Sequence, residues 1–268
     1  MAGRVAFIGA GAMATATIRG LIQSQICAPD SIQACDPLPA AREALMEGTG
    51  VKAFAECGPW MAEADTVILV VKPQHLEQAA AQAAAHINES QLVISFVTGA
   101  RLNSLTAHLG HQRVVRAMPN TAVQVGRGFT VWTASEAVSE SSLARVREIL
   151  NGLGSELYTA DEHHIDIATA VSASGPAYAF LLLESWTDAG VFLGLPRDVA
   201  QKMAMETIAG SMALADATGA HPAVLKSQVT SPGGTTARAL QVFEEGGIRG
   251  LFGRAIRAAH EQSIDLQT

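Results

Sequence analysis

Charged residues are scarce in this sequence of 268 residues. Asp, Glu, Lys and Arg make up 16% of it, whereas residues of the AVILMFWYC class make up 49% and the mean hydropathy is +0.22. This balance excludes a disordered chain, a coiled coil and a collagen-like chain. Long hydrophobic runs are also lacking, since the longest uncharged stretch, Ile167–Leu183, is interrupted by Ser172, Ser174, Gly175 and Pro176. Because a membrane span needs about 20 mostly apolar residues, we expect this stretch to begin a buried helix instead.

Cysteine is rare as well. Cys27, Cys35 and Cys57 are odd in number and lack the Cys-x-x-Cys spacing of zinc or dithiol redox sites. We therefore expect three reduced cysteines that pack as small hydrophobic residues. The histidines also lack the spacing of metal ligands, so no metal site is expected.

Clusters of basic residues are missing too. The 25 acidic and 18 basic residues give a net charge of −7, and no run of five or six basic residues occurs. Neither nucleic acid nor a membrane is therefore an expected partner. The start of the sequence has no charged leader followed by a cleavable apolar stretch, which predicts a protein that stays in the cytoplasm.

The order of hydrophobic patterns predicts an α/β fold. Up to about residue 155, short β-branched runs alternate with alanine-rich helical stretches, which is typical of a parallel sheet with crossover helices. The run Val67–Val71 is apolar on both faces, so helices should cover both sides of a doubly wound Rossmann sheet. The predicted strands are Arg4–Ile8, Ser31–Cys35, Thr66–Val71, Leu92–Val97, Val114–Ala117, Gly128–Thr133 and Glu156–Tyr158.

After about Asp161 helical spacing takes over, which predicts two domains: residues 1–160 for dinucleotide binding and an all-α domain over residues 161–268. Glycine and proline separate the helical segments. The predicted helices are Glu162–Val171, Pro176–Leu193, Arg197–Thr218, Pro222–Val229, Thr235–Glu245 and Leu251–Gln262.

A glycine-rich turn follows the first predicted strand. Gly9, Gly11 and Ala14 form a G-x-G-x-x-A pattern that opens a helix, and Asp36 ends the second strand at the spacing expected for a ribose hydroxyl contact. The alternative is a tight turn without a ligand. The residues of this region predicted to bind a dinucleotide are Ile8, Gly9, Ala10, Gly11, Ala12, Met13 and Asp36.

Other candidate cofactor residues follow later strands, at the edge where nucleotides bind in open sheets. Lys72 could instead be a solvated loop cation, Thr98 could belong to a plain turn, and Asn120 could simply hold its loop. The residues predicted to bind the cofactor in these loops are Val70, Val71, Lys72, Pro73, Val97, Thr98 and Asn120.

The segment Thr230–Thr236 is the most specific indication of a binding site in the helical half. Two glycines and several hydroxyl residues precede a helix there, so exposed backbone N–H groups can bind an anion, although a simple helix cap is the alternative.

The motifs together resemble the pyrroline-5-carboxylate reductase family over essentially the whole chain. The resemblance rests on the following segments: Phe7–Met13, Val71–Pro73, Arg116–Thr121, Ser174–Tyr178 and Ser231–Thr236. It implies a Rossmann domain that binds NADPH or NADH and a helical domain that intertwines with a second subunit. In this family, dimers commonly assemble further into rings. It further implies hydride transfer to the C=N bond of 1-pyrroline-5-carboxylate, which gives L-proline in the last step of proline biosynthesis.

By the same resemblance, the Ser231 hydroxyl and the N–H groups of Gly234 and Thr235 would hold the substrate carboxylate. Thr236 would hydrogen-bond the ring nitrogen as the catalytic residue. The sequence departs from the family pattern at Ala14, Ala122 and Ala173.

Cofactor choice stays open at the level of sequence. Asp36 favours the free 2′-hydroxyl of NADH, whereas Arg42 lies close enough in sequence to reach the 2′-phosphate of NADPH. Two other functions also stay open: another reductase of this architecture, acting on an imine or a 3-hydroxyacid, and a non-catalytic nucleotide sensor. A hydroxyacid enzyme needs a base, and the helical half offers only Lys202 and Lys226.

Overall fold

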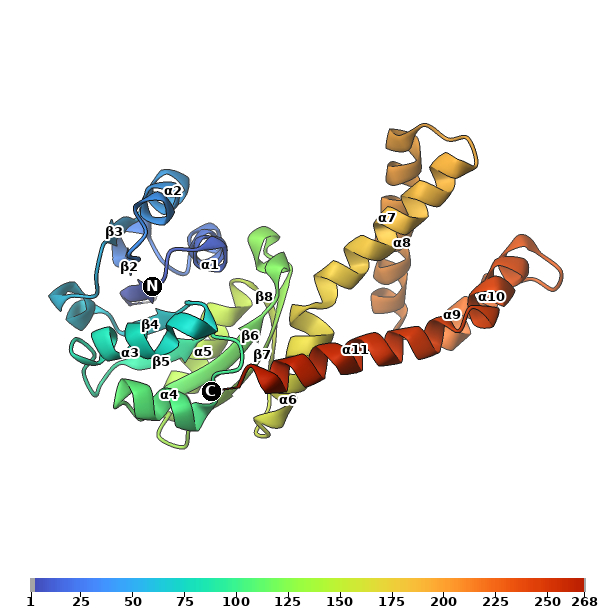
Figure 1. Ribbon diagram of the computed structural model, residues 1–268. Helices are drawn as coiled ribbons and strands as arrows, with labels where there is room; N and C mark the ends of the chain where they lie inside the picture. The colour runs from blue at the N-terminus through green and yellow to red at the C-terminus, as the bar shows by residue number, and fades with distance from the viewer. Residues whose placement is uncertain (1–2, 268) are drawn as a thin grey trace. The chain divides into compact units, whose positions relative to one another are not determined.

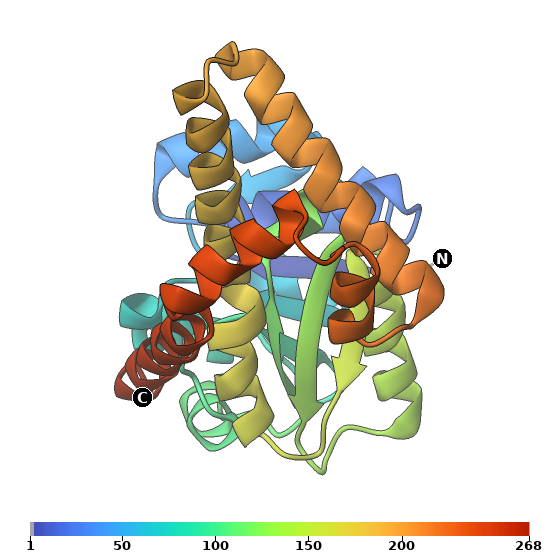
Figure 2. The ribbon, with the colours of Figure 1, turned by 90° about the vertical axis from the view of Figure 1, so that its right-hand side faces the viewer.

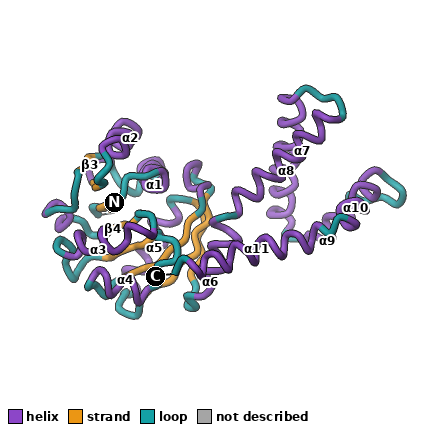
Figure 3. Tube along the Cα trace, in the orientation of Figure 1, coloured by secondary structure: helices purple, strands orange, loops and turns teal. Residues whose placement is uncertain are grey.

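The structure, a computed structural model, describes residues 3–267. The chain falls into two compact units, of which the first holds the chain through Pro176 together with the segment from Ala259 onward. The second unit holds Ala177–Ala258. All strands lie in the first unit, and the second unit is built from helices (Figure 3).

An eight-stranded sheet in the order β3-β2-β1-β4-β5-β6-β7-β8 forms the centre of the first unit (Figure 1). Neighbouring strands are parallel except β6 and β7, which pair antiparallel and lie side by side in Figure 2. The strand order reverses between β1 and β4, which is where ligands bind in such sheets. The strands are β1 Val5–Ile8, β2 Ile32–Cys35, β3 Lys52–Phe54, β4 Thr66–Leu69, β5 Leu92–Ser95, β6 Val114–Pro119, β7 Gly128–Ala134 and β8 Gly154–Tyr158.

Two hydrophobic layers cover the two faces of the sheet. In β4, the side chain of Ile68 packs into one layer, and those of Val67 and Leu69 pack into the other. The first layer contains residues of α1 (Ala12–Gln23), α2 (Pro39–Thr49) and α5 (Glu140–Asn151). The second contains residues of α3 (Leu76–Ala84) and α4 (Leu102–Leu109). The predicted doubly wound sheet, followed by an all-α part, is therefore confirmed.

From His163 onward, all described secondary-structure elements are helices. By length and composition alone, one described helical run, His163–Phe192, could cross a membrane, and 28% of its most apolar window is buried in the single chain. The run contains a π-helical turn, Thr169–Ala173, just before the Ser174-Gly175-Pro176 segment. The helices of this half are α6 His163–Ala168, α7 Gly175–Phe192, α8 Arg197–Thr218, α9 Pro222–Gln228, α10 Thr235–Glu245 and α11 Ile248–Asp265.

Candidate functional site

The glycine-rich turn lies between β1 and α1. Gly9 has φ +108°, and an added Cβ there would overlap the carbonyl oxygen of Val70, so only glycine fits this position. At Gly11 an added Cβ would meet nothing within 4 Å. The helix α1 begins directly after Gly11 and has no side-chain cap, so its first N–H groups face open space. The turn therefore fits a pyrophosphate group.

The carboxylate of Asp36 ties the second strand to this turn. Its Oδ2 accepts the N–H of Ala10 at 2.8 Å, and its Oδ1 accepts the N–H of Leu38 at 2.9 Å. The guanidinium of Arg42 donates from NH1 to the carbonyl oxygens of Asp36 and Pro37, at 2.7 and 3.0 Å. A carboxylate and a cation therefore both lie at the end of β2, and the carboxylate is held by the backbone.

A cavity of about 380 Å³ opens beside the same turn, at the carboxyl ends of β1, β4, β5 and β6. It brings together eight of the predicted cofactor residues: Gly11, Ala12, Met13, Val70, Val71, Lys72, Thr98 and Asn120. Five further residues line it that were not singled out as cofactor residues: Phe96, Met118, Pro119, Thr121 and Ala173. Four of these five lie at the carboxyl end of β5 or β6 or within two residues of it, so their place at strand ends was the available signal, whereas nothing local marks Ala173.

The remaining predicted cofactor residues do not line this cavity. Ile8 and Val97 are buried, with 3% and 1% of their surface exposed, and they support the loops that follow them. Gly9, Ala10 and Asp36 form the hydrogen-bonded base of the turn. The last one, Pro73, begins the short helix Pro73–His75 beyond Lys72.

Asn120 uses its side-chain oxygen to shape its own loop. Its Oδ1 accepts the N–H groups of Ala122 and Phe129, both at 3.2 Å. The loop-holding alternative is therefore observed, and the side-chain NH₂ group is what Asn120 can still offer to a ligand in the cavity. Among the described residues, no group of three or more His, Cys, Asp and Glu side chains could hold a metal ion.

The Ser231–Thr236 loop belongs to the second unit, where it joins α9 to α10. Gly233 has φ +68°, and α10 begins after Gly234 without a side-chain cap. An added Cβ at Gly234 would lie 2.5 Å from Ser231 Oγ, so the Ser231 hydroxyl sits directly over the helix N-terminus. The Gly234 N–H donates to the Ser231 carbonyl oxygen at 3.1 Å. A hydroxyl group and free backbone N–H groups thus converge, and Thr236 is partly buried beside them.

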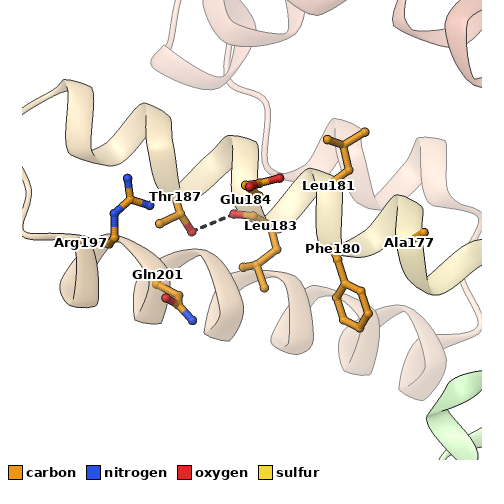
Figure 4. Close-up of a pocket in the computed structure, with 8 residues that line it drawn as sticks. All are labelled: Ala177, Phe180, Leu181, Leu183, Glu184, Thr187, Arg197 and Gln201. Carbon is orange, nitrogen blue, oxygen red and sulfur yellow. Dashed lines mark hydrogen bonds between the residues drawn. The ribbon is translucent and has the colours of Figure 1, made fainter. Parts of the chain in front are cut away.

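A second hollow, of about 560 Å³, lies between α7 and α8 (Figure 4). Its lining is mainly apolar and includes Phe180, Leu181 and Leu183. The hydroxyl of Thr187 already donates a hydrogen bond to the Leu183 carbonyl oxygen, at 2.8 Å. Arg197, at one end, donates to Asp188 at 2.8 Å. The hollow contains no glycine turn like the one between β1 and α1, and its lining offers mainly apolar surface with the Arg197 guanidinium already paired.

Comparison with known proteins identifies relatives of the whole chain. The profile described as pyrroline-5-carboxylate reductase dimerisation matches residues 162–266, and the one described as NADP oxidoreductase coenzyme F420-dependent matches residues 4–99. The pyrroline-5-carboxylate reductase of Pseudomonas aeruginosa is 38% identical over 264 residues, which cover 98% of this chain and 96% of the relative.

Solved structures agree with these relatives. A pyrroline-5-carboxylate reductase from Coxiella burnetii is 31% identical, with a TM-score of 0.90 and full coverage of both chains. The Plasmodium falciparum pyrroline carboxylate reductase, solved with NADP bound, is 27% identical with a TM-score of 0.91, covering 99% of this chain and 98% of that one. A Mycobacterium tuberculosis 3-hydroxyisobutyrate dehydrogenase, 18% identical with a TM-score of 0.53 and coverage of 99% and 92%, shares the fold alone.

Proposed function

The chain belongs to the pyrroline-5-carboxylate reductase family, and we propose that it reduces 1-pyrroline-5-carboxylate to L-proline with NADPH or NADH. The observation that carries this proposal is the Ser231–Thr236 loop, since a reductase of a carboxylated imine needs an anion site of this kind and a nucleotide sensor does not. Residues 1–160 serve dinucleotide binding, and residues 161–268 serve substrate binding and dimerisation.

The dinucleotide binds at the glycine-rich turn. The N-terminus of α1 takes the pyrophosphate in front of Gly11, and Asp36 takes the adenosine ribose. Lys72, Thr98 and Asn120 border the cavity that receives the nicotinamide half. When bound, the reduced nicotinamide supplies the hydride.

The substrate binds at the start of α10. The Ser231 hydroxyl and the N–H groups of Gly234 and Thr235 hold its carboxylate. When the substrate binds, the Gly234 N–H gives up its hydrogen bond to the Ser231 carbonyl oxygen and donates to the carboxylate instead. The positive end of the α10 dipole adds to the attraction. Thr236 hydrogen-bonds the ring nitrogen and so fixes the face of the imine that accepts the hydride.

No strongly perturbed acid is needed for this reaction. An imine protonated on its ring nitrogen is already a good hydride acceptor, so the protein contributes mainly orientation and electrostatics. A 3-hydroxyacid enzyme would need a base, but Lys226 lies 4.0 Å from Glu244 in an exposed ion pair and Lys202 is exposed on α8.

The protein acts in the cytoplasm as a homodimer, and dimers can assemble into larger rings. Support comes from the helical half, which matches the family's dimerisation region and leaves large apolar side chains exposed in the single chain. The exposed fractions of Phe180, Leu181 and Phe192 on α7 are 66%, 61% and 90%. Neither nucleic acid nor a membrane is part of the proposal.

The test is the fall in nucleotide absorbance at 340 nm with 1-pyrroline-5-carboxylate, measured with NADH and with NADPH. Thr236→Val should leave dinucleotide binding unchanged and lower kcat/KM about 100-fold or more, because it removes the hydrogen bond to the ring nitrogen. Thr235→Val is the matched control, since only the N–H of Thr235 is used, and it should stay within about threefold of the parent enzyme. Full activity of Thr236→Val would refute the assigned substrate site.

A further inference from the structure

Two cysteines that lie 22 positions apart in sequence meet in the folded protein. The Sγ atoms of Cys35 and Cys57 are 3.2 Å apart. Cys35 is the last residue of β2 and is 4% exposed, whereas Cys57 is partly buried in the loop after β3. No spacing pattern marks this pair, because the two cysteines come from different crossovers of the sheet.

We propose that Cys35 and Cys57 are a site of reversible oxidation by hydroperoxides, and that closing the disulfide weakens dinucleotide binding. A disulfide needs an S–S distance of about 2.05 Å, so the two sulfur atoms must approach by roughly 1 Å. Ala55 and Glu56, the two residues before Cys57, are exposed and leave this loop room to move.

Cys57 is the thiol that reacts first. It is the more exposed of the two, and the hydrogen bond from the Cys35 thiol to its sulfur lowers the pKa of Cys57. The same hydrogen bond, together with burial, raises the pKa of Cys35, which keeps that thiol protonated. The reactive thiolate is therefore on the accessible side of the pair.

The chemistry balances with one peroxide per disulfide. With hydrogen peroxide, the Cys57 thiolate attacks one peroxide oxygen, the O–O bond breaks, and the products are a sulfenic acid and hydroxide, which takes up a proton to give water; an organic hydroperoxide releases an alcohol in place of this first water. Cys35 then loses its proton, its sulfur attacks the Cys57 sulfur, and the S–O bond breaks to release the second water. Both thiols are oxidised, and the peroxide is reduced.

The pair is connected directly to the proposed dinucleotide site, and this half of the inference rests on the proposed function. The carbonyl oxygen of Cys35 accepts the N–H of Gly9 at 2.8 Å, and Asp36 follows Cys35 in the chain. The N–H of Asp36 in turn donates to the carbonyl oxygen of Phe54 at 3.0 Å, three residues before Cys57. A shift of roughly 1 Å at either sulfur therefore strains the contacts that hold Asp36 and the glycine-rich turn, and displacements of this size have large effects on binding geometry.

Peptide mapping tests the disulfide. The protein is treated with hydrogen peroxide, blocked with iodoacetamide and digested with trypsin, which yields residues 20–42 and, because Lys72 precedes proline, residues 53–101. Since Cys27 and Cys35 share the first peptide, Cys27→Ala makes the assignment unambiguous. The expected result is a cross-link between the two peptides, present in Cys27→Ala and reversed by dithiothreitol. Absence of the cross-link in both proteins overturns the inference.

Binding tests the coupling. The dissociation constant of NADH or NADPH, whichever the reduced protein binds more tightly, should rise about tenfold on oxidation and recover with dithiothreitol. Cys57→Ser is the control, and its affinity should not respond to peroxide. A disulfide that forms without a change in affinity overturns the coupling. If instead the reduced protein binds neither nucleotide, the proposed function fails, while the cross-link still decides the disulfide.

Discussion

The carboxylate of Asp36 accepts the backbone N–H of Ala10, with 2.8 Å between Oδ2 and N. This bond joins the end of β2 to the middle of the glycine-rich turn and fixes the position of the carboxylate before any ligand arrives. A second N–H, from Leu38, holds the other carboxylate oxygen at 2.9 Å. The charge at the proposed ribose site is therefore preorganised.

The first prediction concerns cofactor preference. A fixed carboxylate accepts a hydrogen bond from a 2′-hydroxyl and repels a 2′-phosphate, so kcat/KM should be higher with NADH than with NADPH. Asp36→Asn removes the charge but keeps an oxygen for the Ala10 N–H. The ratio of kcat/KM for NADPH to that for NADH should rise at least about tenfold in this variant.

Arg42 provides the control for this prediction. Its NH1 is bound to the carbonyl oxygens of Asp36 and Pro37, so Arg42→Met should change the ratio little. A selective loss of NADPH use in Arg42→Met would show instead that Arg42 binds the phosphate, and the preference assigned to Asp36 would then be wrong.

The second prediction separates two glycines of the same turn. Gly11→Ala should leave the melting temperature unchanged within about 2 °C, because its Cβ meets no protein atom, and should weaken dinucleotide binding at least about tenfold, because the methyl group occupies the pyrophosphate approach. Gly9→Ala should destabilise the free protein by about 1–3 kcal/mol, since a left-handed φ and an overlap with Val70 both oppose it. Calorimetry of both variants with and without NADH measures the two effects, and unimpaired binding by Gly11→Ala would contradict the site.

The third prediction concerns a buried ion pair. Arg116 and Asp166, 1% and 2% exposed, form an ion pair of 2.6 Å that joins β6 to α6. Arg116→Met leaves the Asp166 charge buried without its main partner and should lower the free energy of unfolding by about 3–5 kcal/mol. Arg116→Met combined with Asp166→Leu should recover most of this loss in urea unfolding. An equal loss in the single and double variants would show that the pair itself is not the cause.

The fourth prediction is a pH dependence. His111 is buried, its Nε2 lies 2.9 Å from the Gln91 carbonyl oxygen, and burial lowers its pKa from the ordinary value of 6.5. Below pH 6.5 the unfolded chain therefore binds a proton that the folded protein does not, so stability falls as the pH drops toward the lowered pKa. The slope from this one group is at most about 1.4 kcal/mol per pH unit, and His111→Gln should remove it. Unfolding free energies measured from pH 7.5 to 5 would refute this account if the two proteins showed the same slope.

Much of the fold could be predicted because periodicity and breakers mark it locally. The predicted limits of α8 and α10 agree with the structure, and each predicted strand is present within a few residues. The strand β3, Lys52–Phe54, was missed because it has three residues, lies at the sheet edge and contains no β-branched residue. The stretch Ile167–Leu183 was expected to be buried, but Phe180 and Leu181 are mostly exposed in the single chain. Composition cannot show whether a helix face is covered by the same chain or by another.

In the site, too, features within one short segment could be predicted, whereas contacts between distant segments could not. The turn from Gly9 to Ala14 could be predicted because its G-x-G-x-x-A spacing is contained in one short segment. The bond from Ala10 to Asp36 and the contact of Cys35 with Cys57 depend on how separate crossovers pack, which spacing in the sequence does not encode. Ala173 reaches the cavity for the same reason.

Transfer of deuterium from the cofactor to the product would show the proposed reaction itself. The protein would be incubated with 1-pyrroline-5-carboxylate and NADH or NADPH deuterated at both C4 positions, and the product examined by mass spectrometry. The expected product is L-proline that carries a single deuterium at C5, formed by the parent protein and about 100-fold more slowly by Thr236→Val. Bound nucleotide without labelled proline, or label in a hydroxyacid product when such substrates are supplied, would contradict the proposed reaction.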